Sequence, residues 1–315
     1  PLVSMPDAND VKEALSHCEL VVVSDCMANT DTTAMAHVLL PAAGWGEKNG
    51  TVTNSERRIS RQRGFLPSPG EAMPDWWIIS QVGQRMGYED AFSWEHPAQI
   101  FDEHARLSAF ENDGKRDFDL SGLVGMSRDE YDAMPPVQWP VNAQWPRGRK
   151  RFFDDGHFYT RNGRARFIAV KAELPPQIQP GHLLMNTGRI RDHWHTMTRT
   201  AKSARLAQHI AEPYADFHPD DARTYGIRDG GLVRLFNERG AIVVRAHVAS
   251  DGRQRQGEIF VPMHWTDRYA SLARMGTLIN KDNDPISGQP ALKRAQVQAE
   301  PFNVSWKGFV LSRDD

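Results

Sequence analysis

The stretch LVRLFNERGAIVVRAHV, residues 232–248, contains two runs rich in aliphatic and β-branched residues that the turn ERG joins. Such side chains fit the pleated surface of a strand, so each run predicts a strand. Two further segments, HLLMNTG from residue 182 and GEIFVPMHW from residue 257, have the same character, and HPDDARTYGI between them predicts a short helix. We therefore expect a small closed β-domain over residues 178–315.

The residues before this domain follow a different pattern. In DANDVKEALSHCELVVVSDC, residues 7–26, apolar positions first recur at helical spacing and then form the continuous run 20–23. A run of this kind is typical of a strand buried in a parallel sheet. A short helix after Asp31 and a second apolar run, 38–40, continue the alternation of helix and strand. This alternation predicts an α/β segment.

Further along, residues 75–86 predict an amphipathic helix with the carboxylate of Asp75 near its start, where a negative charge is favoured. From about residue 90 to 177, proline, glycine and charged residues are interspersed, which predicts a partly irregular connector with one or two helices. Within it, HFYTRNGRARFIAV, residues 157–170, predicts a hairpin turned at Asn162 and Gly163. The expected domains are thus 1–177 and 178–315.

The composition excludes several classes of protein. The 38 Lys and Arg are balanced by 40 Asp and Glu, a net charge of -2, whereas nucleic-acid modules carry a basic excess. Cys18 and Cys26 are too few for a disulfide framework, a four-cysteine zinc site or an iron–sulfur cluster, which fits a reducing, cytoplasmic setting. No apolar run approaches the ~20 residues that cross a bilayer. We expect neither nucleic acid nor membrane as a partner.

Residues 187–200, TGRIRDHWHTMTRT, concentrate hydrogen-bond donors with almost nothing apolar to bury. Arginine forks and threonine hydroxyls suit phosphate oxygens and ring heteroatoms. His193 and His195 lie two residues apart with no third ligand nearby, which is weak evidence for a metal site, and we expect none. The glycines of GWGEKNG miss the GxGxxG spacing of a nicotinamide site.

Ser24 and Asp25 close the first apolar run, and ligands of open α/β sheets bind outside the carboxyl ends of strands. A helix cap or a turn is an equal alternative for Asp25. No Ser-His-Asp or Cys-His pairing can be identified in the sequence, so nucleophilic catalysis has no positive support.

Four segments in a fixed order carry a resemblance that covers nearly the whole chain. They are VVVSDCMANTDTTAMAHVLLPAAGWGEKNGTVTNSERRISRQRGF, TGRIRDHWHTMTRT, FVPMHW and LINKDNDPISGQPALKRAQV. Together they resemble the molybdopterin oxidoreductases that carry two molybdopterin guanine dinucleotides, and most of all the cytoplasmic assimilatory nitrate reductases. The resemblance implies part of a Rossmann-like molybdopterin oxidoreductase domain followed by a double-psi β-barrel that binds the cofactor.

The resemblance also implies which residues contact the cofactor, a molybdenum bis-molybdopterin guanine dinucleotide. The matching positions in this sequence are Ser24, Asp25, Lys48, Asp75, Thr187, Gly188, Arg189, Ile190, Arg191, Asp192, His193, Trp194, His195, Thr196, Asn280 and Lys293. His264 in MHW matches a position near the substrate, so it is either substrate-facing or a histidine that packs the core or the cofactor.

The side-chain ligand of molybdenum and the cysteines of a 4Fe–4S cluster have no match here. The resemblance therefore implies a C-terminal portion of an enzyme, inactive alone, whose partners are nitrate, the N-terminal half, and an electron donor such as ferredoxin, flavodoxin or a flavoprotein. Two alternatives stay open: part of a related enzyme such as formate dehydrogenase, and a non-catalytic module that binds a nucleotide or a protein.

Overall fold

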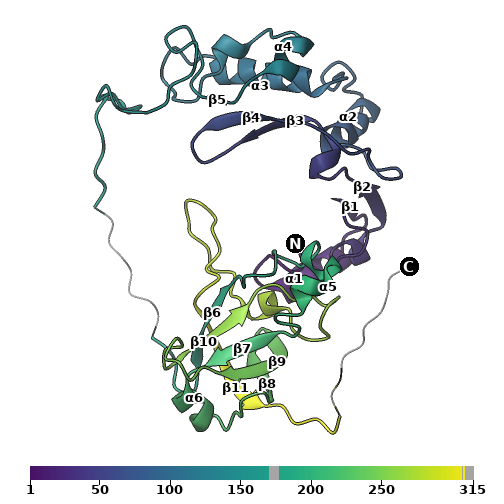
Figure 1. Ribbon diagram of the computed structural model, residues 1–315, viewed down its shortest axis with the longest axis vertical. Helices are drawn as coiled ribbons and strands as arrows, with labels where there is room; N and C mark the ends of the chain where they lie inside the picture. The colour runs from purple at the N-terminus through teal and green to yellow at the C-terminus, as the bar shows by residue number, and fades with distance from the viewer. Residues whose placement is uncertain (170–176, 307, 309–315) are drawn as a thin grey trace. The chain divides into compact units, whose positions relative to one another are not determined.

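The computed structural model describes residues 1–169, 177–306 and 308. The chain forms two compact units, and each is treated by itself (Figure 1). The first unit comprises residues 1–23, 27–39 and 174–315, and the second comprises 24–26 and 40–173. The last residue of the expected hairpin, 170, and residues 171–176 of the expected connector lie outside the described residues. The domain boundary after residue 177 stays a prediction.

A closed barrel of six strands forms the core of the first unit. The strands are β6 (Leu183–Gly188), β7 (Tyr214–Phe217), β8 (Leu232–Asn237), β9 (Gly240–Val248), β10 (Glu258–Pro262) and β11 (Ala295–Pro301). Their order around the barrel is β10-β6-β11-β8-β9-β7, and β7 closes it by pairing with β10. The pairs β6–β10 and β7–β9 are parallel and the others antiparallel. The expected double-psi β-barrel is confirmed.

Alternate residues of these strands fill the barrel because side chains on a strand point to its two faces in turn. Leu183 and Met185 on β6, and Val233 and Leu235 on β8, are essentially fully buried. The helical turns around the barrel are short. They are η4 (Thr200–Lys202), α5 (Ala204–Ala207), α6 (Pro219–Thr224) and η5 (Met275–Leu278).

The N-terminal helix α1 (Ala8–Ser16) packs against η5 of the barrel unit. Asp7, just before the helix, forms an ion pair of 2.6 Å with Arg239. The buried Arg274 donates to the carbonyl oxygen of Leu2 and to the side chain of Asn9. The helix expected in residues 7–26 and the turn after Asp31, observed as η1 (Thr33–Met35), are confirmed.

The first expected strand is present but is not buried. β1 (Val22–Asp25) begins two residues later than the apolar run and pairs with β2 (Val38–Pro41) in a two-stranded sheet. Leu20 is 63% and Val22 49% exposed, whereas Val21 is 6% exposed, so the expected burial of the run 20–23 holds for only part of it among the described residues. An apolar run is buried only where layers cover both faces of its sheet, and a two-stranded sheet lacks them.

The second unit contains an antiparallel sheet that the sequence did not predict. Its strands are β3 (Gly50–Thr53), β4 (Arg58–Gln62) and β5 (Val137–Gln138). The helices of this unit are η2 (Trp45–Glu47), α2 (Asp75–Arg85), α3 (Pro97–Ala109), η3 (Ser121–Leu123) and α4 (Arg128–Ala133). The helix expected at residues 75–86 and the two helices of the connector are confirmed. Ile59, Phe101, Leu120 and Tyr131 lie in the shared core.

The hairpin expected at residues 157–170 is wrong, although its turn is in place. Gly163, at φ 66°, donates to the carbonyl oxygen of Thr160 and accepts from the amide of Phe158. No strand forms in the described residues 157–169. A lone hairpin is marginal in water, and the Phe158 ring instead stacks on Phe153 with centroids 4.5 Å apart.

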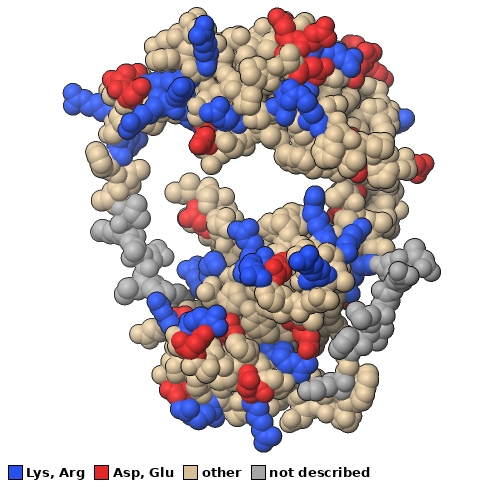
Figure 2. Space-filling model, in the orientation of Figure 1, with Lys and Arg blue, Asp and Glu red and all other residues tan. Residues whose placement is uncertain are grey.

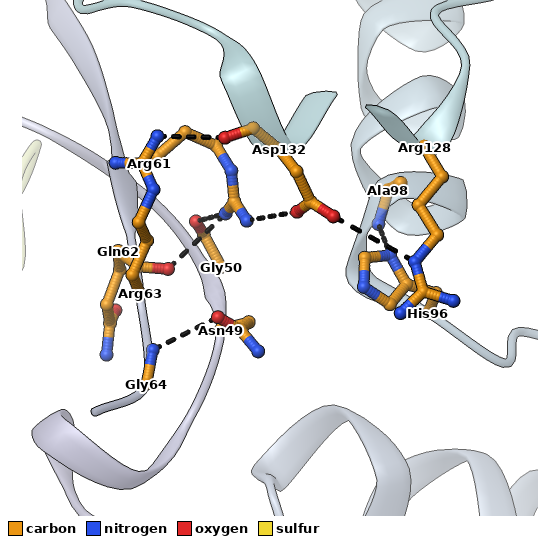
Figure 3. A network of polar contacts seen from close by, with 10 residues as sticks. All are labelled: Asn49, Gly50, Arg61, Gln62, Arg63, Gly64, His96, Ala98, Arg128 and Asp132. Carbon is orange, nitrogen blue, oxygen red and sulfur yellow. Dashed lines mark hydrogen bonds and ion pairs between the residues drawn. The ribbon is translucent and has the colours of Figure 1, made fainter. Parts of the chain in front are cut away.

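A buried arginine joins the sheet to helix α4 in the second unit (Figure 3). The Arg61 side chain is only 2% exposed, and its guanidinium forms an ion pair of 2.8 Å with Asp132. It also donates to the carbonyl oxygens of Gly50 and Gln62 and lies 3.9 Å over the ring of Tyr131. Arg61 therefore connects β3, β4 and α4 through one side chain.

Gly148 occupies a position that excludes other residues, and this gives a testable prediction. Its φ is +78°, and a Cβ there would overlap the carbonyl oxygen of Gln138. Gly148→Ala should lower the free energy of unfolding of the second unit by roughly 2 kcal/mol, from backbone strain and that overlap. A denaturant titration followed by tryptophan fluorescence measures the loss.

Gly156 provides the matched control, because its φ is +72° and nothing lies within 4 Å of the added Cβ. Gly156→Ala should cost only the left-handed backbone, about 1 kcal/mol. Equal losses in the two variants would mean that the approach of Gln138 does not require the glycine.

Acidic and basic side chains are interspersed over the face of the molecule seen in Figure 2, in keeping with the near-neutral net charge. Among the described helices, none combines the length and the apolar character needed to cross a bilayer.

Candidate functional site

The polar loop, residues 189–199, leaves the barrel at the end of β6. Because β6 and β10 run parallel and pair up to Gly188 and Pro262, the segments after both strands begin at the same end of the barrel. The amide of Met263 donates to the carbonyl oxygen of Gly188 at 3.0 Å, which joins the two exits. A Cβ at Gly188 would come within 3.0 Å of the ring of Phe260, so a larger residue there would require that ring to shift.

His264, two residues beyond β10, lies beneath the polar loop and is completely buried. Its Nε2 accepts from the amide of Ile190 at 2.9 Å, and its Nδ1 donates to the carbonyl oxygen of His195 at 2.7 Å. An amide can only donate and a carbonyl can only accept, so the ring is neutral with its proton on Nδ1. Burial lowers the pKa of His264, and the nearby His193 lowers it further.

His193 holds the loop from a second side. It is buried, its Nε2 donates to the carbonyl oxygen of Ile210 at 3.4 Å, and its Nδ1 lies 3.2 Å from the hydroxyl of Thr200. Its ring packs edge-on against Trp265 with centroids 5.5 Å apart. These contacts agree with the hydrogen-bonding role expected for this histidine.

Asp192 is fixed by two neighbours within the barrel unit. Its carboxylate accepts from Arg191 Nε at 3.2 Å and forms a short hydrogen bond with His209 Nδ1. The hydrogen bond from His209, with that from Arg191, holds the pKa of Asp192 below its usual value. Asp192 therefore stays ionised and orients the arginine beside it.

Several side chains of the loop point outward. Arg189, Trp194 and His195 are exposed, and Arg189 makes no hydrogen bond or ion pair within residues 1–169 and 177–306. Arg199 lies 5.2 Å over the ring of Trp194. His195 and Met197 have φ of 33° and 60°, so the backbone turns sharply here. The exposed side chains of the loop thus offer hydrogen-bond donors and aromatic rings, while buried residues hold the loop backbone in place.

The end of β6 also meets the segment before β11. Lys293 Nζ donates to the carbonyl oxygen of Thr187 at 2.6 Å, and the Thr187 hydroxyl donates to the carbonyl oxygen of Leu292 at 2.8 Å. The structure therefore brings Lys293 to the start of the polar loop. Asn280, half-buried after η5, has no side-chain hydrogen bond in the part of the chain that is described.

Four of the expected contact residues belong to the second unit. Lys48 Nζ and Asp75 Oδ2 form an ion pair of 2.5 Å, with side chains 27% and 52% exposed. The two residues, 27 positions apart in sequence, are thus brought together. Ser24 is exposed and Asp25 half-buried at the end of β1, where the Asp25 carbonyl oxygen accepts from the amide of Ala42. A role of these residues toward a ligand stays a prediction.

The barrel carries a groove that sequence reasoning missed. It has a volume of about 940 Å³ and opens along the outer faces of β7, β9 and β10. Its walls include the charged pairs Asp216–His247 and Glu212–Arg245 and the ring of Tyr214, whose pKa burial raises to about 12. Only an alternation of polar residues in β7 signalled it, and that strand is too short to stand out.

Among the described residues no cluster of His, Cys, Asp or Glu is placed to hold a metal ion.

Comparison with known proteins matches both ends of the chain to family models. Residues 1–85 match "Molybdopterin oxidoreductase", and residues 183–296 match "Molydopterin dinucleotide binding domain".

Similar proteins include a nitrate reductase of Klebsiella oxytoca, 45% identical over 318 residues, which covers 99% of this chain and 36% of that protein. The assimilatory nitrate reductase catalytic subunit of Bacillus subtilis is 32% identical, with 96% of this chain and 41% of that protein covered. The F420-dependent formate dehydrogenase subunit alpha of Methanocaldococcus jannaschii is 34% identical, with 95% and 42% covered. The chain thus spans less than half the length of these relatives.

A solved structure, acetylene hydratase from Pelobacter acetylenicus, superposes with a TM-score of 0.68 at 18% identity, covering 95% of this chain and 42% of that one. At that identity the likeness concerns the fold.

Proposed function

Because this chain belongs to the molybdopterin oxidoreductase family, we propose that it is a cofactor-binding part of a nitrate reductase that reduces nitrate to nitrite for assimilation. The similarity to the nitrate reductases of Klebsiella oxytoca and Bacillus subtilis supports this substrate. A cytoplasmic location, a 4Fe–4S cluster elsewhere in the enzyme, and a ferredoxin, flavodoxin or flavoprotein donor belong to the same proposal.

The family's cofactor, molybdenum held by two molybdopterin guanine dinucleotides, is also the cofactor of this chain. The polar loop fits such a group, because Arg189 is an exposed fork without a protein partner among the described residues, and Arg191 is oriented by Asp192. Guanidinium forks match phosphate oxygens bidentately. When bound, the cofactor supplies the two-electron chemistry, whereas this chain supplies position and charge.

The proposal rests on one observation: buried residues fix the backbone of the polar loop, and other residues of the same loop are exposed. Its backbone is fixed by the buried His264 and His193, while Arg189, Trp194 and His195 face outward. A backbone held in place with outward donors favours the binding of a large polar ligand, since less conformational freedom is then lost at binding. We expect Arg189, Arg191 and Lys293 to hold phosphate or pterin oxygens.

The full-length protein tests this function directly. Purified with its cofactor, it should contain molybdenum and release GMP on acid treatment, and it should form nitrite from nitrate with a reduced viologen dye. The contradicting result is a protein that carries cofactor and oxidises formate but leaves nitrate unchanged. That outcome would favour the second candidate, a formate dehydrogenase, for which the 34% identity to the Methanocaldococcus jannaschii subunit speaks. A protein without molybdenum or GMP would favour a non-catalytic binding module.

A further inference from the structure

We propose that His264 is a positioning residue, which holds the polar loop in its binding shape as a neutral imidazole and does not act on substrate. The inference rests on the proposed function, because the polar loop matters only if it binds the cofactor. It decides between the two roles that the sequence left open for this histidine.

The geometry of the two ring contacts carries the proposal. Ile190 stands at the start of the polar loop and His195 five residues later, and one ring bonds the backbone of both, at 2.9 and 2.7 Å. The ring is 0% exposed and packs 5.7 Å from the ring of His193 and 6.4 Å from that of Trp265. Both nitrogens are occupied by backbone groups, so neither is left to donate to a substrate or accept from one.

Protonation would break this arrangement. A proton on Nε2 would face the amide hydrogen of Ile190, which puts two donors against each other. The titratable and charged groups that face the ring are His193, His195 and Arg189, and each opposes a positive charge there. Burial is the largest cause and lowers the pKa of His264; the hydrogen bond to the carbonyl oxygen of His195 raises it in part, and the net shift is downward.

The sign of the pH dependence follows from this lowered pKa. Below the usual value of 6.5, a released loop takes up a proton on the ring before the folded loop does. The loop conformation held by neutral His264 is therefore fully stable above about pH 6.5. It loses stability as the pH falls from there toward the lowered pKa of His264. Cofactor held by the polar loop should be released faster across that window.

The test uses the full-length protein with its cofactor and three variants that separate the two contacts. His264→Asn keeps a donor near the position of Nδ1, His264→Gln keeps an acceptor near that of Nε2, and His264→Phe keeps only ring volume. Molybdenum and GMP per protein should fall at least about tenfold in Phe, which loses both buried hydrogen bonds, and less in Asn and Gln, which each keep one. His17→Gln, on an exposed histidine directly after α1, is the control and should leave the content unchanged.

The second readout is the rate of cofactor release between about pH 5 and about pH 8. Release should accelerate below about pH 6.5 in the unchanged protein but not in His264→Gln, which has no titrating ring. Full cofactor content in the Asn and Gln variants together with a raised KM for nitrate would overturn the proposal in favour of a substrate-facing role. The same pH dependence in Gln and in the unchanged protein would also overturn it. If the proposed function itself fails, the unchanged protein already lacks cofactor or nitrate activity.

Discussion

Replacing Arg61 by Ala should lower the free energy of unfolding of the second unit by roughly 3 kcal/mol, the low end of the range for breaking a buried ion pair. The low end applies because Asp132 is 45% exposed and regains water when its partner is lost. The remaining cost comes from the carbonyl oxygens of Gly50 and Gln62, which lose a donor, and from the space left beside Tyr131. Denaturant titration followed by tryptophan fluorescence measures the change.

Two further variants serve as comparisons. Arg61→Met separates charge from packing at this position, and Arg63→Ala is a neighbouring control. Arg61→Met fills most of the volume but leaves Asp132 and the carbonyl oxygens of Gly50 and Gln62 without the guanidinium, so its loss should be smaller than that of Ala only by the contribution of packing. Arg63 donates a single bond to the backbone of Asp132, and Arg63→Ala should cost under about 1 kcal/mol. If Arg63→Ala destabilised the unit as much as Arg61→Ala, the central place of Arg61 in this network would be wrong.

Replacing Arg189 by Ala in the full-length enzyme should lower cofactor content at least about tenfold, since each buried acceptor left without a partner costs roughly 1 to 3 kcal/mol. Arg189→Lys should lower it less, because lysine keeps the charge but not the planar fork that matches two oxygens at once. The two variants are compared by measuring molybdenum and GMP per protein together with the rate of nitrite formation.

Arg205, an exposed arginine on the short helix α5, is the matched control, and Arg205→Ala should change neither quantity. Activity lost at unchanged cofactor content would move Arg189 to substrate binding. Unchanged activity and content together would remove it from the site, as expected of an arginine that only contributes to the surface.

Part of the barrel was predictable because two of its strands have a clear local sequence pattern. β8 and β9 are runs of aliphatic residues around a tight turn, and their pairing is antiparallel and adjacent in sequence. β7 has only four residues, and β11 alternates small apolar residues with Gln296 and Gln298 without a long aliphatic run, so both signals are weaker than those of β8 and β9. Their strand identity comes from the partners that the closed barrel provides.

The second unit was harder to predict for a related reason. β3 and β4 are rich in Thr, Ser, Arg and Gln, and of the two buried residues of β4, Ile59 and Arg61, only the first is apolar. An arginine in a core position is rare without a partner, and its partner Asp132 lies 71 residues further along the chain. A single sequence gives no means to join them.

For the candidate site, composition was enough to single out the polar loop, but not to divide its residues by role. The sequence treats His193 and His195 alike, whereas the structure buries His193 and leaves His195 exposed. It also left His264 open between two roles. These differences depend on which backbone groups need a partner after the barrel closes, and that is decided by residues far away in the chain.

The parallel pairing of β6 with β10 has a consequence for the order in which the protein is made. Ile190 and the histidine that binds its amide are 74 residues apart, and the segment between them includes β7, β8, β9 and β10 itself. Contacts of such long range form late, because the intervening chain must first be ordered. A nascent chain that has emerged from the ribosome only as far as β9 therefore lacks this histidine, and on its proposed role the loop takes its binding shape only after β10 and His264 have been made.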